Sequence, residues 1–288
     1  MPREKSSPGS SSHVRLVPTT WRSTSPIAVS VGPISTRWRA TASYSCVVGH
    51  EIVGEVTLAG ANVEMLAVGD RVAVGAHVWA CWNKNPDAPC RNCALREDAL
   101  CDHAVYTYDS TYEDGSPSYG GYADYIRLDS NYAFKLPDNL SSDVAAPLMY
   151  AGVTVFTPLK REGVKAGDRV GVVGVAFSRS ANKEQEVRAL GAAEFFNLSS
   201  EDGQKKATNS VDYLILTAHA NNMPYNLYLS LLHECGTLIM LGIPNDEIKF
   251  SPLFVMRALR VHGSLIGGIQ DVKDVLGWLP RRTGAQSR

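Results

Sequence analysis

Apolar residues alternate with polar residues and glycines over short stretches in the first half of the chain. The stretches VVGHEIVGEVTLAG (47–60), GDRVAV (69–74) and GGYADYI (120–126) each combine turn residues with a run of strand length. The period changes near Ser141, because SSDVAAPLMYAGVTVFTPLKREG (141–163) has a Ser/Asp start signal and the apolar spacing of a helix. The first half is therefore predicted to be mostly β structure, with a boundary near residue 150.

Apolar runs of strand length recur after this helix and are separated by polar, helix-compatible segments. They are GVVGV (171–175), DYLILT (212–217), TLIMLGI (237–243) and VHGSLIG (261–267). Strands that alternate with helices indicate a parallel, Rossmann-type sheet. The sequence thus predicts a two-domain α/β protein, with a β-rich domain at 46–150 and an incomplete Rossmann-type domain at 151–270. Residues 271–288 are expected to be a truncated tail, since RRTGAQSR has no apolar period.

Residues 1–45 differ in composition from the rest of the chain. They contain six basic residues, one acidic residue and many Ser, Thr and Pro, without a sustained helical or strand period. Disorder or a mispredicted gene start is the expectation for this segment. An organellar transit peptide has a similar composition and stays as the alternative.

The overall composition is that of an ordinary globular protein, with 288 residues, 44% hydrophobic and 20% charged. A formal net charge of −1 gives no reason to expect a nucleic-acid or membrane partner. No apolar stretch has the length of a membrane span. The cysteines cluster instead of spreading as in a disulfide scaffold, which favours a reducing, cytoplasmic location.

Four of the six cysteines lie within residues 81–101, in the pattern Cys81-x8-Cys90-x2-Cys93-x7-Cys101. Four sulfurs can enclose one tetrahedral zinc ion and leave no open position, which is typical of a structural site. The alternative is four unrelated thiols. A zinc-knuckle that binds nucleic acid fits poorly, because acidic residues (Glu97, Asp98 and Asp102) flank the cysteines.

The motifs are ordered along the chain as in one family. VVGHEIVGEV, GDRVAVGAHV, the four-cysteine segment, TYEDGSPSYGGYADYIRLDSNYAFKLPDNL and SSDVAAPLMYAGVTVFTPLKREGVKAGDRVGVVG together resemble zinc-dependent medium-chain alcohol dehydrogenases. The similarity is greatest to the cinnamyl-alcohol-dehydrogenase-like branch and runs from about Val47 to Trp278. It implies a GroES-like first domain and reversible hydride transfer between alcohols and aldehydes, with a nicotinamide cofactor and a catalytic zinc. It also implies a possible homodimer, paired through Val261–Ile266.

In this family a catalytic zinc accompanies the structural one. By resemblance His50 and Glu51 are the catalytic zinc ligands, but no early Cys-Gly motif precedes Cys46, and Tyr150 stands where a later cysteine is expected. Two ligands fall short of the usual three plus water. Cys46 either joins the ion or is a free thiol, and the free thiol is the favoured interpretation. For the structural zinc, the insertion WNKNPDAP leaves His77 or Asp87 as alternatives to Cys81.

The nucleotide site has a gap. In GVVGVAFSRS (171–180) only Ala176 and Phe177 separate the first strand from Ser178-Arg179-Ser180, where a glycine-rich phosphate loop and a helix belong. A parallel crossover takes at least about 10–12 residues. Residues 171–175 and 176–178 are therefore predicted to form one continuous strand or an irregular join, not neighbouring parallel strands, and the pyrophosphate cradle is expected to be absent.

The element that selects the cofactor is still present. Two hydroxyls, a guanidinium and an ammonium suit the 2′-phosphate of NADP(H), and a solvated basic turn is the alternative. The predicted cofactor-binding residues are Thr154, Ser178, Arg179, Ser180, Lys183, Gly242, Ile243 and Ser264. The predicted function is NADP(H)-linked oxidation of small primary alcohols or reduction of aldehydes. The alternative is an inactive, zinc-stabilised remnant or a splice or gene-model product.

Overall fold

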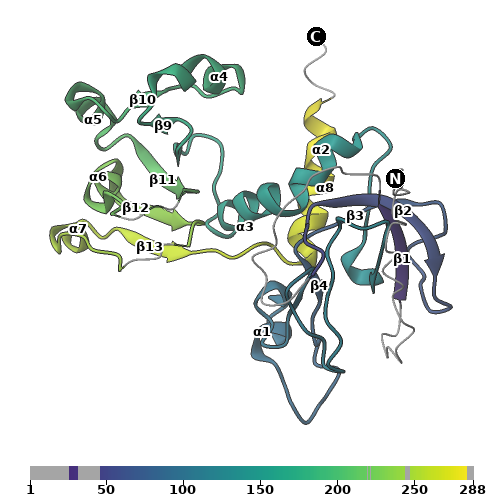
Figure 1. Ribbon diagram of the computed structural model, residues 1–288. Coiled ribbons are helices and arrows are strands. Elements are labelled where there is room, and N and C mark those ends of the chain that lie inside the picture. Colours follow the sequence, from purple (N-terminus) through teal and green to yellow (C-terminus); the bar gives the residue numbers. More distant parts are fainter. Residues whose placement is uncertain (1–25, 32–45, 219, 221, 244–246, 284–288) are drawn as a thin grey trace, which may run out of the picture.

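The computed structural model describes residues 26–31 and 46–283, apart from 219, 221 and 244–246. Two β-sheet regions lie on either side of helices α3 and α8, as Figure 1 shows. None of the helices in the described residues is long and apolar enough to cross a bilayer. The expectations for 1–25, 32–45 and 284–288 concern segments outside the described residues.

The first sheet is antiparallel, with strand order β6-β1-β2-β3-β7. Its buried face belongs to a core that includes Ile52, Val56, Val72 and Leu128. The strands of this region are β1 (Pro26–Val31), β2 (Ile52–Ala59), β3 (Arg71–Val74), β6 (Tyr125–Asp129) and β7 (Phe134–Lys135), and a separate pair is formed by β4 (His77–Trp79) and β5 (Val105–Tyr106). Short helices α1 (Arg91–Ala94), η1 (Asp98–Leu100) and η2 (Ser130–Tyr132) complete it.

Strand β1 corrects the expectation of disorder for residues 26–31 of the segment 1–45. Residues 26–31 pair with β2 on one side and with β6 on the other, both antiparallel. Six residues give too short a pattern to stand out in the sequence. Both of their hydrogen-bonding edges are nevertheless satisfied by strands that follow much later in the chain.

Three helical segments join the two domains. They are α2 (Ser142–Pro147), the π-helical turn η3 (Leu148–Gly152) and α3 (Val153–Arg161). Met149 and Val153 are fully buried in a core that also contains Ala73 and Phe134 of the first sheet. The predicted helix over 141–163 is therefore present and is anchored on the β-rich domain.

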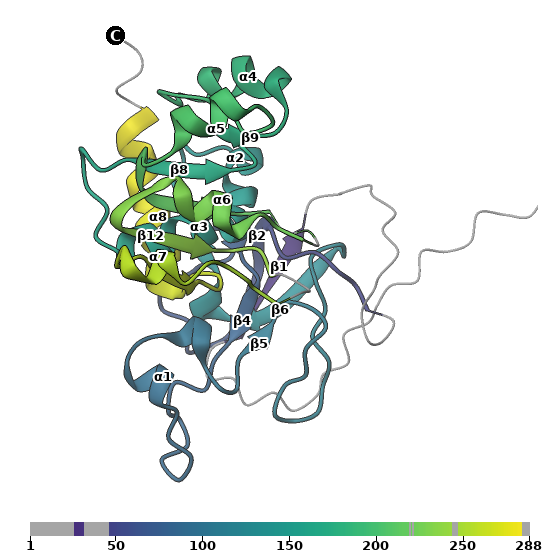
Figure 2. The same ribbon diagram turned by 90° about the vertical axis from the view of Figure 1, so that its left-hand side faces the viewer.

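The second sheet is parallel, with order β10-β9-β8-β11-β12-β13. This is the 3-2-1-4-5-6 strand order of a dinucleotide-binding fold, so all six of its strand positions are filled. Its strands are β8 (Val170–Val173), β9 (Phe177–Ser178), β10 (Phe196–Asn197), β11 (Val211–Leu216), β12 (Leu232–Met240) and β13 (Arg260–Gly263). The helical segments between them are η4 (Ala181–Lys183), α4 (Glu184–Ala189), α5 (Glu201–Ala207), α6 (Tyr225–Ser230) and α7 (Leu253–Met256). Figure 2 labels α4 to α7 beside the strands of this sheet.

The prediction that 171–175 and 176–178 cannot be neighbouring parallel strands is wrong. β8 and β9 are parallel neighbours, but only Val173 and Phe177 face each other. A crossover helix is needed when the chain must return to the amino end of the sheet, whereas β9 begins level with the last residue of β8. A turn with Gly174 at φ +89° makes this step, and no helix lies between the two strands.

The expected tail over 271–288 is helical as far as residue 283, because α8 (Ile269–Thr283) is a fifteen-residue helix. Val272, Val275 and Leu276 are buried against Phe134 and Met149. The segment therefore returns from the parallel sheet to the first domain. Its apolar spacing is hard to recognise in the sequence because the buried face ends before the polar RRTGAQSR.

Candidate metal and nucleotide sites

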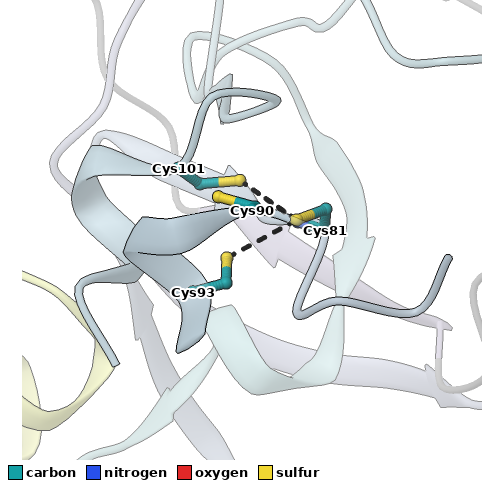
Figure 3. Close-up of side chains that lie close together, drawn as sticks. All are labelled: Cys81, Cys90, Cys93 and Cys101. Carbon is teal, nitrogen blue, oxygen red and sulfur yellow. Dashed lines mark hydrogen bonds between the residues drawn. The ribbon is translucent and has the colours of Figure 1, made fainter. Parts of the chain in front are cut away.

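The four cysteines come together in one buried cluster (Figure 3). Cys81 follows β4, Cys90 precedes α1, Cys93 lies in α1 and Cys101 follows η1. All four sulfurs lie within 4.8 Å of one another, and Sγ of Cys81 is 3.6 Å from Sγ of both Cys93 and Cys101. Four Zn–S bonds of about 2.3 Å in a tetrahedron place the sulfurs about 3.8 Å apart. The cluster therefore fits a structural zinc ion.

The local environment can hold the sulfurs either as protonated thiols or as zinc-bound thiolates. Burial raises the pKa of Cys93 and of Cys101, so without a metal these sulfurs stay protonated. Backbone N–H groups of Cys81 and His103 lie 3.4 and 3.3 Å from Sγ of Cys101, where they can donate to a thiolate. A zinc ion would displace the thiol protons. The backbone N–H groups of Cys81 and His103 would then still donate to the Cys101 thiolate.

Cys81 is a member of this cluster despite the insertion that follows it. The inserted loop turns back at once, with N–H of Lys84 donating to the Cys81 carbonyl at 2.9 Å. The Asn83 side chain then accepts from N–H of Cys90 at 2.6 Å and fixes the second ligand. Neither His77 nor Asp87, the two alternatives to Cys81, belongs to the cluster.

His50 and Glu51 lie in a segment held against a pair of glycines. N–H of Gly120 donates to the Val47 carbonyl at 2.7 Å, and N–H of Gly121 donates to the Gly49 carbonyl at 2.9 Å. A Cβ at Gly120 would lie 2.5 Å from the Gly49 carbonyl oxygen, so only glycine allows this approach. The GHE segment and the GGY segment of the sequence therefore contact each other through their backbones.

Aromatic rings enclose His50. The Tyr150 ring centroid lies 4.2 Å from that of His50, and the Tyr108 ring stacks on the imidazole at 5.5 Å. Burial lowers the pKa of His50, and the charge of Glu51 opposes this shift. Glu51 accepts a hydrogen bond from N–H of Ala151 at 3.2 Å. The side chain at position 150 is therefore beside the predicted zinc ligand, as expected for the missing cysteine, but it is a phenol.

The described residues do not supply the family's catalytic zinc site. The four-cysteine cluster is the only group of three or more His, Cys, Asp or Glu ligands among them. Cys46 is half-buried and burial raises its pKa, but it does not complete a three-ligand group with His50 and Glu51. Two ligands beside a bulky phenol do not fit a tightly held ion.

The predicted cofactor residues other than Thr154, which is on α3, lie at the carboxyl ends of the parallel strands. Arg179, Ser180 and Lys183 are exposed after β9, while Ser178 is buried in it and its Oγ accepts from N–H of Ser180 at 3.1 Å. Lys183 Nζ approaches the Gly174 carbonyl at 3.4 Å, at the place where a phosphate loop normally begins. No helix begins directly after β8, so its described surroundings offer no helix N-terminus to a pyrophosphate.

The remaining cofactor residues differ in how free their polar groups are. Oγ1 of Thr154 donates to the Tyr150 carbonyl at 2.6 Å and is engaged within its own helix. Gly242 and Ile243 follow β12, and the Ile243 side chain is exposed. Oγ of Ser264, just after β13, is buried and has no hydrogen-bond partner among the described residues.

The comparisons with known proteins cover both domains. The family model "Alcohol dehydrogenase GroES-like domain" matches residues 25–138, and "Zinc-binding dehydrogenase" matches 165–281. A mannitol dehydrogenase of Petroselinum crispum is 36% identical over 266 residues, which is 84% of this chain and 76% of that protein. Among solved structures, cinnamyl alcohol dehydrogenase SbCAD4 of Sorghum bicolor has a TM-score of 0.81 at 25% identity, over 90% of this chain and 80% of its own.

A second solved structure is that of the Helicobacter pylori enzyme named CAD, complexed with NADP(H). It has a TM-score of 0.75 at 26% identity, over 90% of this chain and 81% of its own. Fold and cysteine cluster together define a zinc-binding dehydrogenase with a GroES-like and a Rossmann-type domain. The chain belongs to the zinc-dependent medium-chain alcohol dehydrogenase family, in its cinnamyl-alcohol-dehydrogenase-like branch.

Two contacts of these sites carry no signal in the sequence. Tyr108 stacks on His50 from a loop distant in sequence, and no motif marks it. Asp98 stands out in the sequence only as an acid that flanks the cysteines, but it contacts the first residue of α8. Both contacts join segments far apart in the chain, so spacing alone could not reveal them.

Proposed function

We propose that this protein is an oxidoreductase that transfers hydride between NADP(H) and a small primary alcohol or its aldehyde. The observation that carries the proposal is family membership across both domains, with the six strands of the cofactor sheet in dinucleotide-binding order. The named relatives are a mannitol dehydrogenase, a cinnamyl alcohol dehydrogenase and the enzyme named CAD, which is complexed with NADP(H). Their names refer to different alcohols, so they support the class of substrate and not one compound.

The adenosine side of the cofactor fits this chain better than its centre does. Arg179, Ser180 and Lys183 are exposed together after β9 and would bind the 2′-phosphate. The unpartnered Ser264 hydroxyl would donate to the cofactor at the end of β13. When bound, the nicotinamide supplies or accepts the hydride. The pyrophosphate would lie beside Gly174 without a helix N-terminus, which predicts weak cofactor binding.

The substrate side rests on His50 and its neighbours. His50 is kept neutral by burial between Tyr108 and Tyr150, so one ring nitrogen can accept a hydrogen bond. Glu51 ties this segment to the start of the interdomain helix through Ala151. The chain would bind one zinc tightly, in the four-cysteine cluster. A second zinc, on His50 and Glu51 alone, would be lost on dialysis.

The direct test is the oxidation of NADPH by the full chain with a benzaldehyde-type substrate, followed by absorbance, with NADH as the comparison cofactor. Turnover that prefers NADPH is expected. Arg179→Ala should raise KM for NADPH roughly tenfold by removing a charge-assisted contact of about 1.4 kcal/mol, with little effect on kcat. Lys206→Ala is the matched control, because Lys206 lies on α5 and pairs with Asp202.

Metal content measured on the same preparation separates the two functions. One tightly bound zinc with NADPH-dependent turnover supports the proposal. One zinc without turnover, also in the presence of added zinc, would overturn it. That result would establish the alternative of a zinc-stabilised protein without catalytic activity.

We also propose that the chain forms a homodimer through the outer edge of β13, as the family resemblance implies. β13 is the last strand in the order of the parallel sheet and pairs only with β12 among the described strands. An unpaired edge can add a strand from a second copy. Light scattering should then give twice the chain mass of 31.2 kDa, and a monomer at micromolar concentration would contradict this.

The proposed compartment is the cytoplasm. All six cysteines are free thiols, and four of them form the zinc cluster. A reducing compartment keeps such thiols available to a metal. Fractionation of the native source with an antibody against the chain would test this location.

A further inference from the structure

The four-cysteine lobe (81–101) makes a direct contact with the first residue of α8. N–H of Ile269 is 3.3 and 3.2 Å from the two carboxylate oxygens of Asp98, a lobe residue between Cys93 and Cys101. The Tyr132 hydroxyl donates to the same carboxylate at 3.4 Å, and Asp98 is 2% exposed. The first N–H groups of a helix have no partner within it, so a carboxylate here satisfies a donor and opposes the positive end of the helix.

The backbone before α8 is shaped to this contact. A Cβ at Gly268 would lie 2.4 Å from Oδ1 of Asp98, so a larger residue would push the carboxylate away. Ile266 has a φ of +28°, which is rare for a β-branched residue. It is nevertheless buried against Ala99 of the lobe and Ala76. The lobe therefore contacts both the start of α8 and the link that connects α8 to β13.

Charged side chains add a second connection between the lobe and the domain junction. The Arg161 guanidinium, at the end of α3, pairs with the Glu97 carboxylate of the lobe and lies 4.0 Å from Oδ2 of Asp271 on α8. Lys160 pairs with Asp271 at 2.8 Å and with Asp274 at 2.6 Å. Lobe, α3 and α8 thus meet in one ionic cluster. α3 and α8 are also the helices that lie between the two sheets in Figure 1.

We propose that the four-cysteine lobe is a metal-dependent clamp on the junction between the two domains. With a metal on the cysteines, the lobe holds Asp98 at the N-terminus of α8 and Glu97 against α3. The sulfurs form the centre of the lobe, whose loops have few apolar residues of their own, so its shape depends on the ion. Loss of the metal frees Asp98, and the start of α8 loses its buried partner. The metal state of the lobe is thereby transmitted to the link between the two domains.

Amide hydrogen exchange of the full chain tests this clamp without relying on activity. Zinc removal by a chelator should accelerate exchange in the lobe and in the first turns of α8. Asp98→Ala should accelerate exchange in α8 about tenfold, equivalent to about 1.4 kcal/mol, while one zinc per chain is retained and the lobe stays slow. Zinc removal from this variant should then add little at α8, since both changes break the same contact.

The matched control is Asp102→Asn, an exposed acid of the same segment whose described side-chain partner is Asn92 and not α8. It should leave α8 exchange unchanged. Helix α5 follows β10, which lies at the edge of the parallel sheet opposite β13. Amide exchange in α5 serves as the internal reference and should not respond to zinc. If Asp98→Ala fails to fold, zinc removal from the unaltered chain and the variant Glu97→Gln, at a half-buried position, still give the answer.

Three outcomes would overturn the proposal. In the first, zinc removal opens the lobe but leaves α8 exchange as it was. In the second, Asp98→Ala retains zinc and does not change α8. In the third, exchange rises uniformly, including in α5, which would mean that the metal supports global folding and not a local clamp. None of these results depends on whether the chain turns over an aldehyde.

Discussion

His77 offers a quantitative test, because its imidazole is buried beside the zinc lobe. Its side chain is 4% exposed, and neither ring nitrogen has a hydrogen bond of acceptable geometry. Nδ1 lies 3.8 Å from Oδ2 of Asp98, too far for a hydrogen bond, and the Tyr132 ring packs edge-on at 4.7 Å. Burial lowers the pKa of His77 to about 4, and the Trp79 backbone opposes the shift. The imidazole is therefore neutral in the folded protein.

The sign and size of the effect follow from linkage. In the unfolded chain His77 binds a proton below its ordinary pKa of 6.5, whereas the folded chain does not until about pH 4. Between these values the unfolded state holds more protons, so stability is lost as the pH falls. A fully developed difference is worth about 3.4 kcal/mol, and about 1.4 kcal/mol of it appears between pH 7.5 and 5.5. Burial raises the pKa of Asp98, which acts in the opposite direction as the pH falls.

The assay is urea unfolding of the zinc-loaded chain, followed by tryptophan fluorescence at pH 7.5 and 5.5. His77→Phe is the reference variant, because it keeps an aromatic ring and removes only the titrating group. The unaltered chain should lose about 1.4 kcal/mol more than this variant between the two pH values. Metal loss at acidic pH affects both proteins alike. Equal losses in the two proteins would show that His77 is already protonated or hydrated in the fold.

Further predictions concern the metal sites and the glycine contact. Tyr150→Cys should raise tightly bound zinc from one to two per chain, by completing a three-ligand set with His50 and Glu51, and a metal content that stays at one would refute this. Cys93→Ser should abolish tight zinc binding and lower Tm by about 5 °C or more, whereas the exposed Cys235→Ser should do neither. Gly120→Ala should cost about 1–3 kcal/mol in chemical unfolding, since its Cβ would meet the Gly49 carbonyl, and a neutral result would show that this segment can move apart.

Local patterns were sufficient for the family, the two-domain order and the cysteine cluster. The spacing of Cys90 and Cys93 within one short segment limits how far apart their sulfurs can lie, so this prediction needed little tertiary information. The same holds for the helix over 141–163 and for the strand-like runs of the parallel sheet. These features depend on neighbours in sequence, and the residue types record them directly.

Other predictions failed where distant segments decide the structure. The sequence did not reveal β1, because the strands that pair with it, β2 and β6, come later in the chain. It did not reveal α8, because the buried face of this helix packs against residues of the first domain. The β8–β9 contact was excluded by a rule for strands that pair along their length, whereas in this sheet a single pair suffices. The minimum loop length applies to a crossover connection, but β8 and β9 are joined by a turn and not by a crossover.

What the sequence determined by itself is the set of chemical groups: four thiols at zinc-binding spacing, a histidine and a glutamate without their third ligand, and a basic turn after a strand. What only the tertiary structure decided is where those groups are held. Tyr150 and Tyr108 enclose His50, and the Asp98 carboxylate of the cysteine lobe contacts the start of α8. Such contacts depend on the whole packed chain, because burial and hydrogen-bond satisfaction are properties of the complete fold. Covalent order constrains neighbours, while packing selects partners across any distance in sequence.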